Sequence, residues 1–404
     1  MLGLLILLAA STVGGSDLQA DGLQALDHQQ FAQAEQIFSK LAAQDPKDYT
    51  AFFNLALAES GLQKPDDAIS HYRKVLELKP NLFEAELNLG ILYLRKKQNA
   101  EAVPLLQDAV KQKPDQPRPK RHLADALLAS GKAAEAGDLY KQALEKDPKL
   151  AAAELGLGQS LLAQGALDEA APHFRQAATL DANLKSYLMQ LATAFEKANR
   201  PADAVPLLQE FPSDVAAHEE LGRLYLSLNR PADAVAEFSQ SVAVSPTPAN
   251  QLALATAYLK NNQPDLAAPI LEQALASSPN DYELRMVVGR LRRDRHNYVE
   301  AAREFTVAAR IKPDSVEAWN EAAAAFVLSA QYPEALTALD KVHSLNGDTP
   351  GDLYYRAVVY DKLHQIKQAL ASYEQFLQSS SGKFPDQEFI ARQRSRILAK
   401  EANR

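Results

Sequence analysis

The chain of 404 residues contains no cysteine. This absence excludes disulfides, zinc sites with cysteine ligands, a cysteine nucleophile and a lipid-modified N-terminal cysteine. Aromatic residues make up only 7% of the chain although apolar residues make up 47%, so the apolar side chains are mostly alanine and leucine. Both are strong helix formers, and runs of alternating β-branched or aromatic residues, which indicate strands, are almost absent. The composition predicts an all-α protein.

The chain also lacks an excess of positive charge and a hydrophobic run long enough to span a membrane. Its net charge is −8, which argues against nucleic-acid binding because that usually requires a basic surface. The one strongly apolar stretch, residues 2–10, is far shorter than the run of about 20 residues that a membrane-spanning helix needs. We therefore expect neither a nucleic-acid partner nor an integral membrane span.

Small residues follow this apolar stretch at positions 11–16, which is typical of a secretory signal peptide. No lysine or arginine precedes Lys40, so the positively charged start of such a peptide is missing. The sequence predicts a signal peptide over residues 1–15 and an exported protein, periplasmic or secreted. The alternatives are an apolar N-terminal cap of a cytoplasmic protein and a membrane anchor.

A repeat of 34 residues organises the rest of the chain. Alanine recurs at steps of 34 residues, apart from one step of 30 and one of 33. Glycine or alanine stands twelve residues before each of these alanines, and a large residue (Phe, Tyr or Leu) stands four residues after it. The eleven alanines are Ala34, Ala68, Ala102, Ala136, Ala170, Ala204, Ala234, Ala267, Ala301, Ala335 and Ala369.

Each repeat is predicted to form two antiparallel helices, A and then B. The small residues mark the place where the two backbones come closest, and the large residue fills the gap against the next repeat. One repeat cannot bury its apolar face alone, so stacking supplies the stability. Prolines two residues after the alanine predict that helix B begins late in four repeats, because a helix tolerates proline only near its first turn. These prolines are Pro104, Pro172, Pro206 and Pro269.

The pattern of a large residue, Leu, Gly or Ala and Tyr on helix A, followed by Ala, Phe or Tyr and Pro, resembles the tetratricopeptide repeat (TPR) family. Trp319 stands at the first position of that motif and is followed by Ala323, Phe326, Ala335 and Leu339. The resemblance covers about residues 15–380. It implies an all-α, right-handed superhelix (a solenoid) of about eleven TPR helix pairs. In this family the concave face is lined by A helices and receives peptides or protein segments.

The sixth repeat, residues 185–214, is four residues short, about one helical turn. We expect it to separate an N-terminal array of six repeats, residues 16–214, from a C-terminal array of five, residues 215–381. The shortening is either a tolerated deletion or a hinge. Residues 382–404 are expected to form a capping helix with a polar outer face; docking on a membrane surface or an acidic partner is the alternative.

No catalytic, metal-binding or cofactor-binding motif appears in the sequence. The eight histidines are spread over different repeats, and no pair has the helical spacing of metal ligands. Glycine-rich phosphate loops and the nucleophile elbow of hydrolases are absent as well. We predict a protein that is not an enzyme and that needs no metal or cofactor.

Candidate partner-binding residues follow from the family resemblance. Positions next to the Leu–Gly/Ala pair face the groove in this family, and Asn54, Asn88, His122 and Gln190 take one such position in different repeats. Asparagines stacked in this way can hold a peptide backbone through N–H and C=O bonds. Two of them resemble rungs of the asparagine ladder in O-linked N-acetylglucosamine transferase repeats. Solvated polar surface is the alternative.

The densest positive charge is a group of five arginines between residues 285 and 295 in the ninth repeat. Arg290 and Arg293 are one turn apart and are expected to face the groove, where they would pair with the carboxylates of an acidic segment. Tyr354, two repeats later, could add an aromatic contact. A solvated charged face is the alternative.

The sequence therefore predicts a scaffold or assembly factor that binds a protein or peptide partner in the concave TPR groove. A broad-specificity periplasmic chaperone that holds unfolded chains is the alternative. The identity of the partner and the oligomeric state stay open at this stage.

Overall fold

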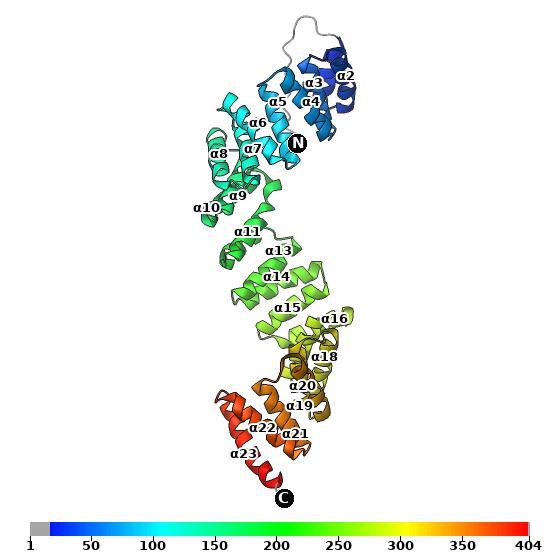
Figure 1. Ribbon diagram of the computed structural model, residues 1–404, viewed down its shortest axis with the longest axis vertical. Helices are drawn as coiled ribbons and strands as arrows, with labels where there is room; N and C mark the ends of the chain where they lie inside the picture. Colours follow the sequence, from blue (N-terminus) through cyan, green and yellow to red (C-terminus); the bar gives the residue numbers. More distant parts are fainter. Residues whose placement is uncertain (1–16, 403–404) are drawn as a thin grey trace. The chain divides into compact units, whose positions relative to one another are not determined.

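The computed structural model describes residues 17–402, which form 23 α-helices and one short 3₁₀ helix (Figure 1). This part of the chain contains no strand, which confirms the predicted all-α class. The expected signal peptide at residues 1–15 lies outside the described residues, so export stays a prediction. None of the described helices is long and apolar enough to cross a membrane.

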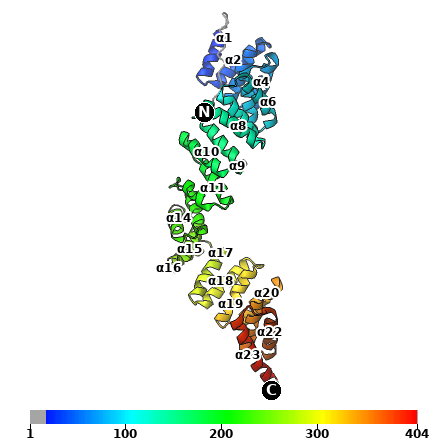
Figure 2. The ribbon, with the colours of Figure 1, turned by 90° about the vertical axis from the view of Figure 1, so that its left-hand side faces the viewer.

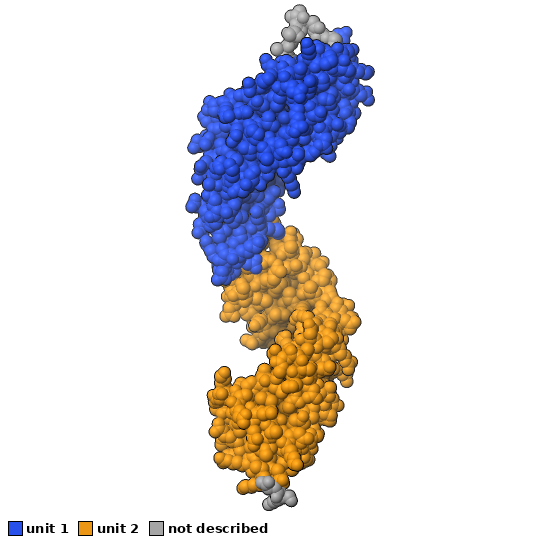
Figure 3. Space-filling model, viewed as in Figure 1, with its two compact units in different colours: residues 1–207 blue, residues 208–404 orange. Residues whose placement is uncertain are grey.

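The chain divides into two compact units, one ending at Leu207 and the other beginning at Leu208 (Figure 3). The helices of the first unit are α1 Asp17–Asp27, α2 Phe31–Gln44, α3 Tyr49–Gly61, α4 Pro65–Leu78, α5 Phe83–Arg95, α6 Asn99–Gln112, α7 Pro117–Ala129, α8 Ala133–Lys146, α9 Ala151–Ala163, α10 Leu167–Leu180, the 3₁₀ helix η1 Ala182–Leu184, and α11 Tyr187–Lys197. Helix α12, Pro201–Leu208, contains the division.

The second unit continues the same alternation of helices, seen from a second side in Figure 2. Its helices are α13 Val215–Ser227, α14 Pro231–Val244, α15 Pro248–Lys260, α16 Pro264–Ser277, α17 Tyr282–Asp294, α18 Tyr298–Ile311, α19 Val316–Leu328, α20 Tyr332–Asn346, α21 Pro350–Lys362, α22 Ile366–Ser380 and α23 Pro385–Ala402. Odd-numbered helices up to α21 are A helices and even-numbered ones are B helices. The described residues therefore contain the eleven predicted pairs, and α23 packs on the last B helix.

The repeated spacing of small and large residues builds the core of each unit. All eleven alanines of the repeat are completely buried. The large residue four positions later packs against the small residue of its own A helix: a Cβ placed on Gly158 would lie 2.8 Å from Phe174. It also reaches the next repeat, as predicted, because the Nδ2 of Asn88 donates to the hydroxyl of Tyr72 at 3.2 Å. Tyr72 also packs on Phe53 of its own A helix, at 5.4 Å between ring centroids, so this one side chain joins the two helices of its pair and the pair that follows.

The prediction that four B helices begin late is wrong. Helices α6, α10, α12 and α16 each begin five residues before the proline, which therefore lies in the second turn. Proline removes the amide that would bond the carbonyl four residues earlier. Both Pro104 and the residue whose carbonyl is freed, Ala100, are exposed, so water can bond this carbonyl. The same holds for the other three prolines.

Each of the eleven turns from helix A to helix B contains one residue with a left-handed backbone, with φ between 56° and 80°. Glycine, which adopts this conformation without steric strain, takes only two of these positions, Gly131 and Gly165. The others are Gln, Lys, Asn, His and, at position 330, alanine. Asparagine and histidine are enriched at positive φ, but Gln29, Gln63, Lys97 and Ala330 are not of these types, so in these four turns the packing of the two helices imposes the conformation against local preference.

The sixth pair is the irregular one. Helix α12 has 8 residues, whereas the other B helices have 14 or 15. The division between the two compact units falls inside this short helix. Whether the shortening of this pair is a tolerated deletion or a hinge stays open, and the expected arrays 16–214 and 215–381 stay predictions.

Candidate partner-binding site

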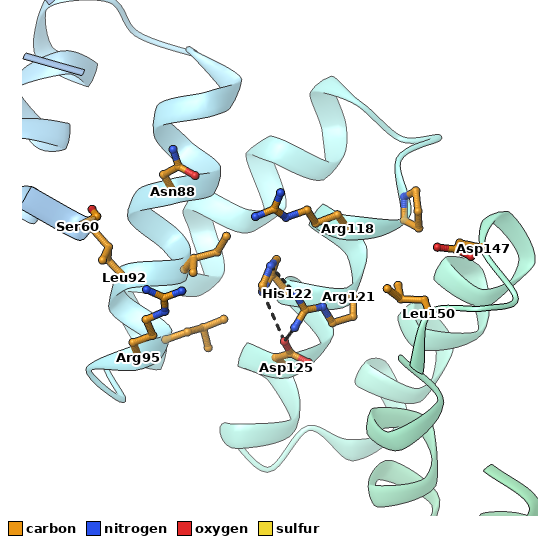
Figure 4. Close-up of a pocket in the computed structure, with 13 residues that line it drawn as sticks. Ser60, Asn88, Leu92, Arg95, Arg118, Arg121, His122, Asp125, Asp147 and Leu150 are labelled. Atoms are coloured by element: carbon orange, nitrogen blue, oxygen red, sulfur yellow. Dashed lines mark hydrogen bonds and ion pairs between the residues drawn. The ribbon is translucent and has the colours of Figure 1, made fainter. Parts of the chain in front are cut away.

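A cavity of about 700 Å³ lies in the first unit, between the A helices α5 and α7 and the start of α9 (Figure 4). Helix α5 contributes polar residues and an apolar floor that includes Ile91 and Leu92, and Leu150 closes the far side. The charged and polar residues that line the cavity are Ser60, Asn88, Arg95, Arg118, Arg121, His122, Asp125 and Asp147.

Helix α7 provides most of the charged side chains of the cavity, because its charged residues are spaced so that they lie on one side of the helix. Arg118, Arg121, His122 and Asp125 follow at steps of three, one and three residues, which places them along one side of the helix. The helix opens with Pro117, where a missing amide donor costs little. Figure 4 shows the side chains of Arg118 from α7 and Arg95 from α5 pointing into the space between the two helices.

A hydrogen-bond network holds three of these side chains. Arg121 donates from Nη1 to Oδ2 of Asp125 at 2.9 Å and from Nη2 to Nε2 of His122 at 2.8 Å. Because arginine only donates, Nε2 of His122 is an acceptor and its Nδ1 carries the proton, 3.5 Å from Asp125. Burial lowers the pKa of His122, and the nearby positive charge of Arg121 adds to the effect against the opposing influence of Asp125. The imidazole is therefore neutral at neutral pH.

Tyr140, on the B helix α8, is the fourth side chain of this network. Its hydroxyl donates to Oδ1 of Asp125 at 2.8 Å, and burial together with the charge of Asp125 strongly raises the pKa of the phenol. The ring fits only because α9 has a glycine where it passes: a Cβ on Gly156 would lie 2.7 Å from the Tyr140 hydroxyl and closer still to its ring. The position of Asp125 thus depends on a residue of the next pair.

Two arginines of the cavity have no carboxylate partner in the described part of the chain. Neither Arg95 nor Arg118 forms an ion pair with any described residue. Burial lowers the pKa of Arg118, and the positive charges of Arg121 and Arg95 lower it further. Arg121 also keeps a buried donor, Nε, without an acceptor in the described part of the chain. The arrangement is suited to an incoming anion.

The structure brings two of the predicted groove residues into this cavity, Asn88 and His122. Asn54 is completely buried, and neither of its amide atoms has a hydrogen-bond partner among the described residues. Gln190 is exposed and accepts a long bond of 3.4 Å from Gln159. The four residues therefore do not form one continuous polar ladder, and partner binding by Asn54 and Gln190 stays a prediction.

The arginine cluster of the ninth repeat is neutralised within the chain. Arg290 bonds Glu317 at 2.5 Å and also contacts Glu321 at 3.4 Å, and Arg293 bonds Glu321 at 2.5 Å. The other three arginines of the cluster also form ion pairs: Arg285 and Arg292 with Glu304, and Arg295 with Asp265. A partner's carboxylates would have to compete with these, so binding by Arg290 and Arg293 stays a prediction.

Tyr354 lies apart from that cluster, on α21. Its ring is packed 5.2 Å, centroid to centroid, from Phe376 of α22. It also lines a separate cavity next to Asp361 and Arg394, between the last pair and α23. Its role in partner binding stays a prediction.

Sequence reasoning missed Arg95, Arg118, Arg121 and Asp125. A signal for Arg118 and Arg121 was present, because residues 117–122 read Pro-Arg-Pro-Lys-Arg-His, a basic group at the start of an A helix. No group of three His, Asp or Glu residues that could hold a metal ion occurs among the residues that the structure describes.

One family model, described as tetratricopeptide repeat, matches residues 20–82, 121–184, 189–248 and 252–316, and a second with the same description matches residues 60–126. The chain belongs to the tetratricopeptide repeat family. TPR proteins are typically non-enzymatic scaffolds for protein interactions, and this TPR chain has that scaffold architecture. No curated protein gives a significant sequence match to it.

Several solved structures are similar to this TPR chain. MamA, residues 41 to the end, from Desulfovibrio magneticus RS-1 is 22% identical, with 41% of this chain and 94% of that chain covered and a TM-score of 0.39. MamA MSR-1 is 23% identical over 41% of this chain and 95% of that chain, with a TM-score of 0.38. MamA AMB-1 is 24% identical over 41% of this chain and 99% of that chain, with a TM-score of 0.39.

Proposed function

We propose that this TPR scaffold binds an acidic segment of a partner protein in the cavity between α5 and α7. The observation that carries the proposal is the pair Arg95 and Arg118, which face the cavity without an ion pair to any described residue. A chain with a net charge of −8 attracts acidic ligands only where positive charge is concentrated. Guanidinium groups bind carboxylates through two parallel N–H bonds, so arginine is suited to this task.

The surroundings favour a peptide over a small anion. Apolar side chains, Leu92 and Leu150 among them, lie next to the arginines, so a segment that places an apolar side chain beside an acidic one would satisfy both. Asn88 also lines the cavity, and a side-chain amide can bond both the N–H and the C=O groups of a backbone. Ligand sites of this kind combine an apolar lining with a few polar groups that fix orientation.

The test is selection of peptides from a random display library on the purified chain. We expect the selected peptides to be enriched in Asp and Glu. Their affinity for R95E/R118E should fall by about tenfold or more, because each lost charged hydrogen bond is worth about 1.5–3 kcal/mol. The matched control is R303E/R310E, which makes the same change of charge at two exposed arginines of the B helix α18.

Two outcomes would contradict the proposal: selected peptides without acidic enrichment, or equal affinity of both double variants for the acidic peptides. Weak capture of many unrelated sequences by all variants would instead favour a chaperone that holds unfolded chains. Loss of binding in R290E/R293E alone would move the acidic site to the ninth repeat.

A further inference from the structure

Helix α23 has an outer face that no described helix covers. It packs on α22 through its inner face, where Ala391 and Leu398 are buried. Among the described residues, ten large apolar side chains are exposed, and four of these lie on or just before α23. They are Phe384, Phe389, Ile390 and Ile397, with Phe389 64% exposed. The other six lie on six different helices, so this terminal helix carries more exposed large apolar side chains than any other described helix.

The outer face carries an ordered stripe of five exposed residues. Asp386, Phe389, Gln393, Ile397 and Lys400 follow at steps of three, four, four and three residues. At 3.6 residues per turn these steps keep all five within a band of about 80° on the helix. The stripe is symmetric in chemistry about its centre: an amide in the middle, an apolar residue on each side of it, and opposite charges at the two ends.

We propose that this stripe binds the same stripe on a second copy of the chain, with the two α23 helices antiparallel and a two-fold axis at Gln393. In that register Phe389 faces Ile397 of the second copy, because the two residues lie four positions before and four positions after Gln393. Two-fold contacts require such self-complementary surfaces. The two Gln393 amides meet at the axis, where each can donate to the other's carbonyl.

The charges at the two ends of the stripe favour the antiparallel direction of the two α23 helices. The antiparallel register places Asp386 opposite Lys400 of the second copy, at both ends of the contact. Neither residue forms an ion pair within the described part of its own chain, so both are available. A parallel arrangement would bring like charges together at each end, which is unfavourable.

A second copy fits the stripe better than a lipid surface does. Arg392 and Arg396 are exposed beside the stripe, as cations are on a membrane-binding face, but Arg392 pairs with Glu388 of its own helix. An anionic lipid surface would repel Asp386 at one end of the stripe, whereas a second copy offers it Lys400. The contact is a single helix on each side, smaller than the roughly 800 Å² per partner of a stable interface. We therefore expect a reversible dimer with a dissociation constant on the order of micromolar. The inference is independent of the acidic-segment site in the first unit.

Sedimentation equilibrium of the full chain over a range of concentrations tests the inference. Wild type should show a monomer–dimer equilibrium. In D386K both ends of the stripe carry lysine, and in K400D both carry aspartate. The dissociation constant of the dimer should therefore rise in each variant alone, by up to about tenfold. An equimolar mixture of the two restores opposite charges at both ends and should regain association. F389S should weaken the dimer by about tenfold or more, since it removes two buried phenyl rings.

The control is D314K, which reverses an exposed acidic residue outside α23 and should dimerise like wild type. Far-UV circular dichroism of each variant verifies that it is folded. Three results would overturn the inference: a wild type that stays monomeric at every concentration, a dimer that F389S leaves intact, or a mixture of D386K and K400D that associates no better than its components.

Discussion

Gly156 lies at the tightest contact near the candidate site, and G156A tests how the site is held together. A Cβ at this position would lie 2.7 Å from the hydroxyl of Tyr140 and closer to its ring. Tyr140 is only 1% exposed, so the ring has no free space on its other side. Either the ring or helix α9 must move. In both cases the 2.8 Å bond from Tyr140 to Asp125 is strained or broken.

The structure allows an estimate of the loss. Overpacking a dense core costs about 1–3 kcal/mol, and a hydrogen bond to a charged group contributes about 1.5–3 kcal/mol. Alanine regains about 1 kcal/mol over glycine in a helix interior. We therefore expect G156A to destabilise the α7–α9 region by between about 1.5 and 5 kcal/mol.

Hydrogen exchange with mass spectrometry is the suitable assay, because repeat proteins open locally and a global midpoint would average the effect. Amides of α7, α8 and α9 should exchange faster in G156A than in wild type. The matched control is G351A, since a Cβ at Gly351 meets no atom closer than 3.7 Å; its exchange should be unchanged or slower. Unchanged protection of α7–α9 in G156A would refute the account of how Tyr140 positions Asp125.

Two further predictions concern stability. Ala330 has a left-handed backbone with φ 57°, whereas Gly131 takes the corresponding turn position with φ 80° and open space around it. A330G should therefore stabilise its turn and G131A destabilise its own, each by about 1 kcal/mol; exchange of the flanking amides measures both, and equal signs would contradict the strain argument. His71 is the second case, because its hydrogen bond to Glu59 at 2.8 Å raises the pKa of the imidazole against the opposing effect of burial. The folded state then favours the protonated ring, so this stabilisation is present below the unfolded pKa and is lost as pH rises through the higher folded pKa. Urea unfolding should show H71Q to be less stable than wild type at pH about 5.5, by about 1 kcal/mol or less, with the gap closing at pH about 8; a gap that widens with pH would contradict this.

The two arginine groups show how far residue patterns reach toward a site. The cluster at residues 285–295 is dense in sequence, yet Arg290 and Arg293 pair with Glu317 and Glu321 of the next repeat. The group that stays unpaired, Arg95 and Arg118, comes from two different repeats and is less dense. Charge density along the chain did not predict which cations are available, because the carboxylates that neutralise them lie on a neighbouring helix.

The sequence by itself determined the family, the eleven helix pairs and the buried alanines. This was possible because every pair repeats the same local pattern of small and large residues, and each repeat packs only against its neighbours. The tertiary structure alone decided where proline is tolerated inside a helix, through the exposure of the freed carbonyl, and which polar side chains face a cavity. Asn54 and Asn88 occupy the same position of successive repeats, yet Asn54 is enclosed without a hydrogen-bond partner among the residues that the structure describes, and Asn88 lines the candidate site. Equivalent positions in a repeat share a backbone geometry, but the neighbouring side chains differ from pair to pair and set each residue's exposure and charge environment.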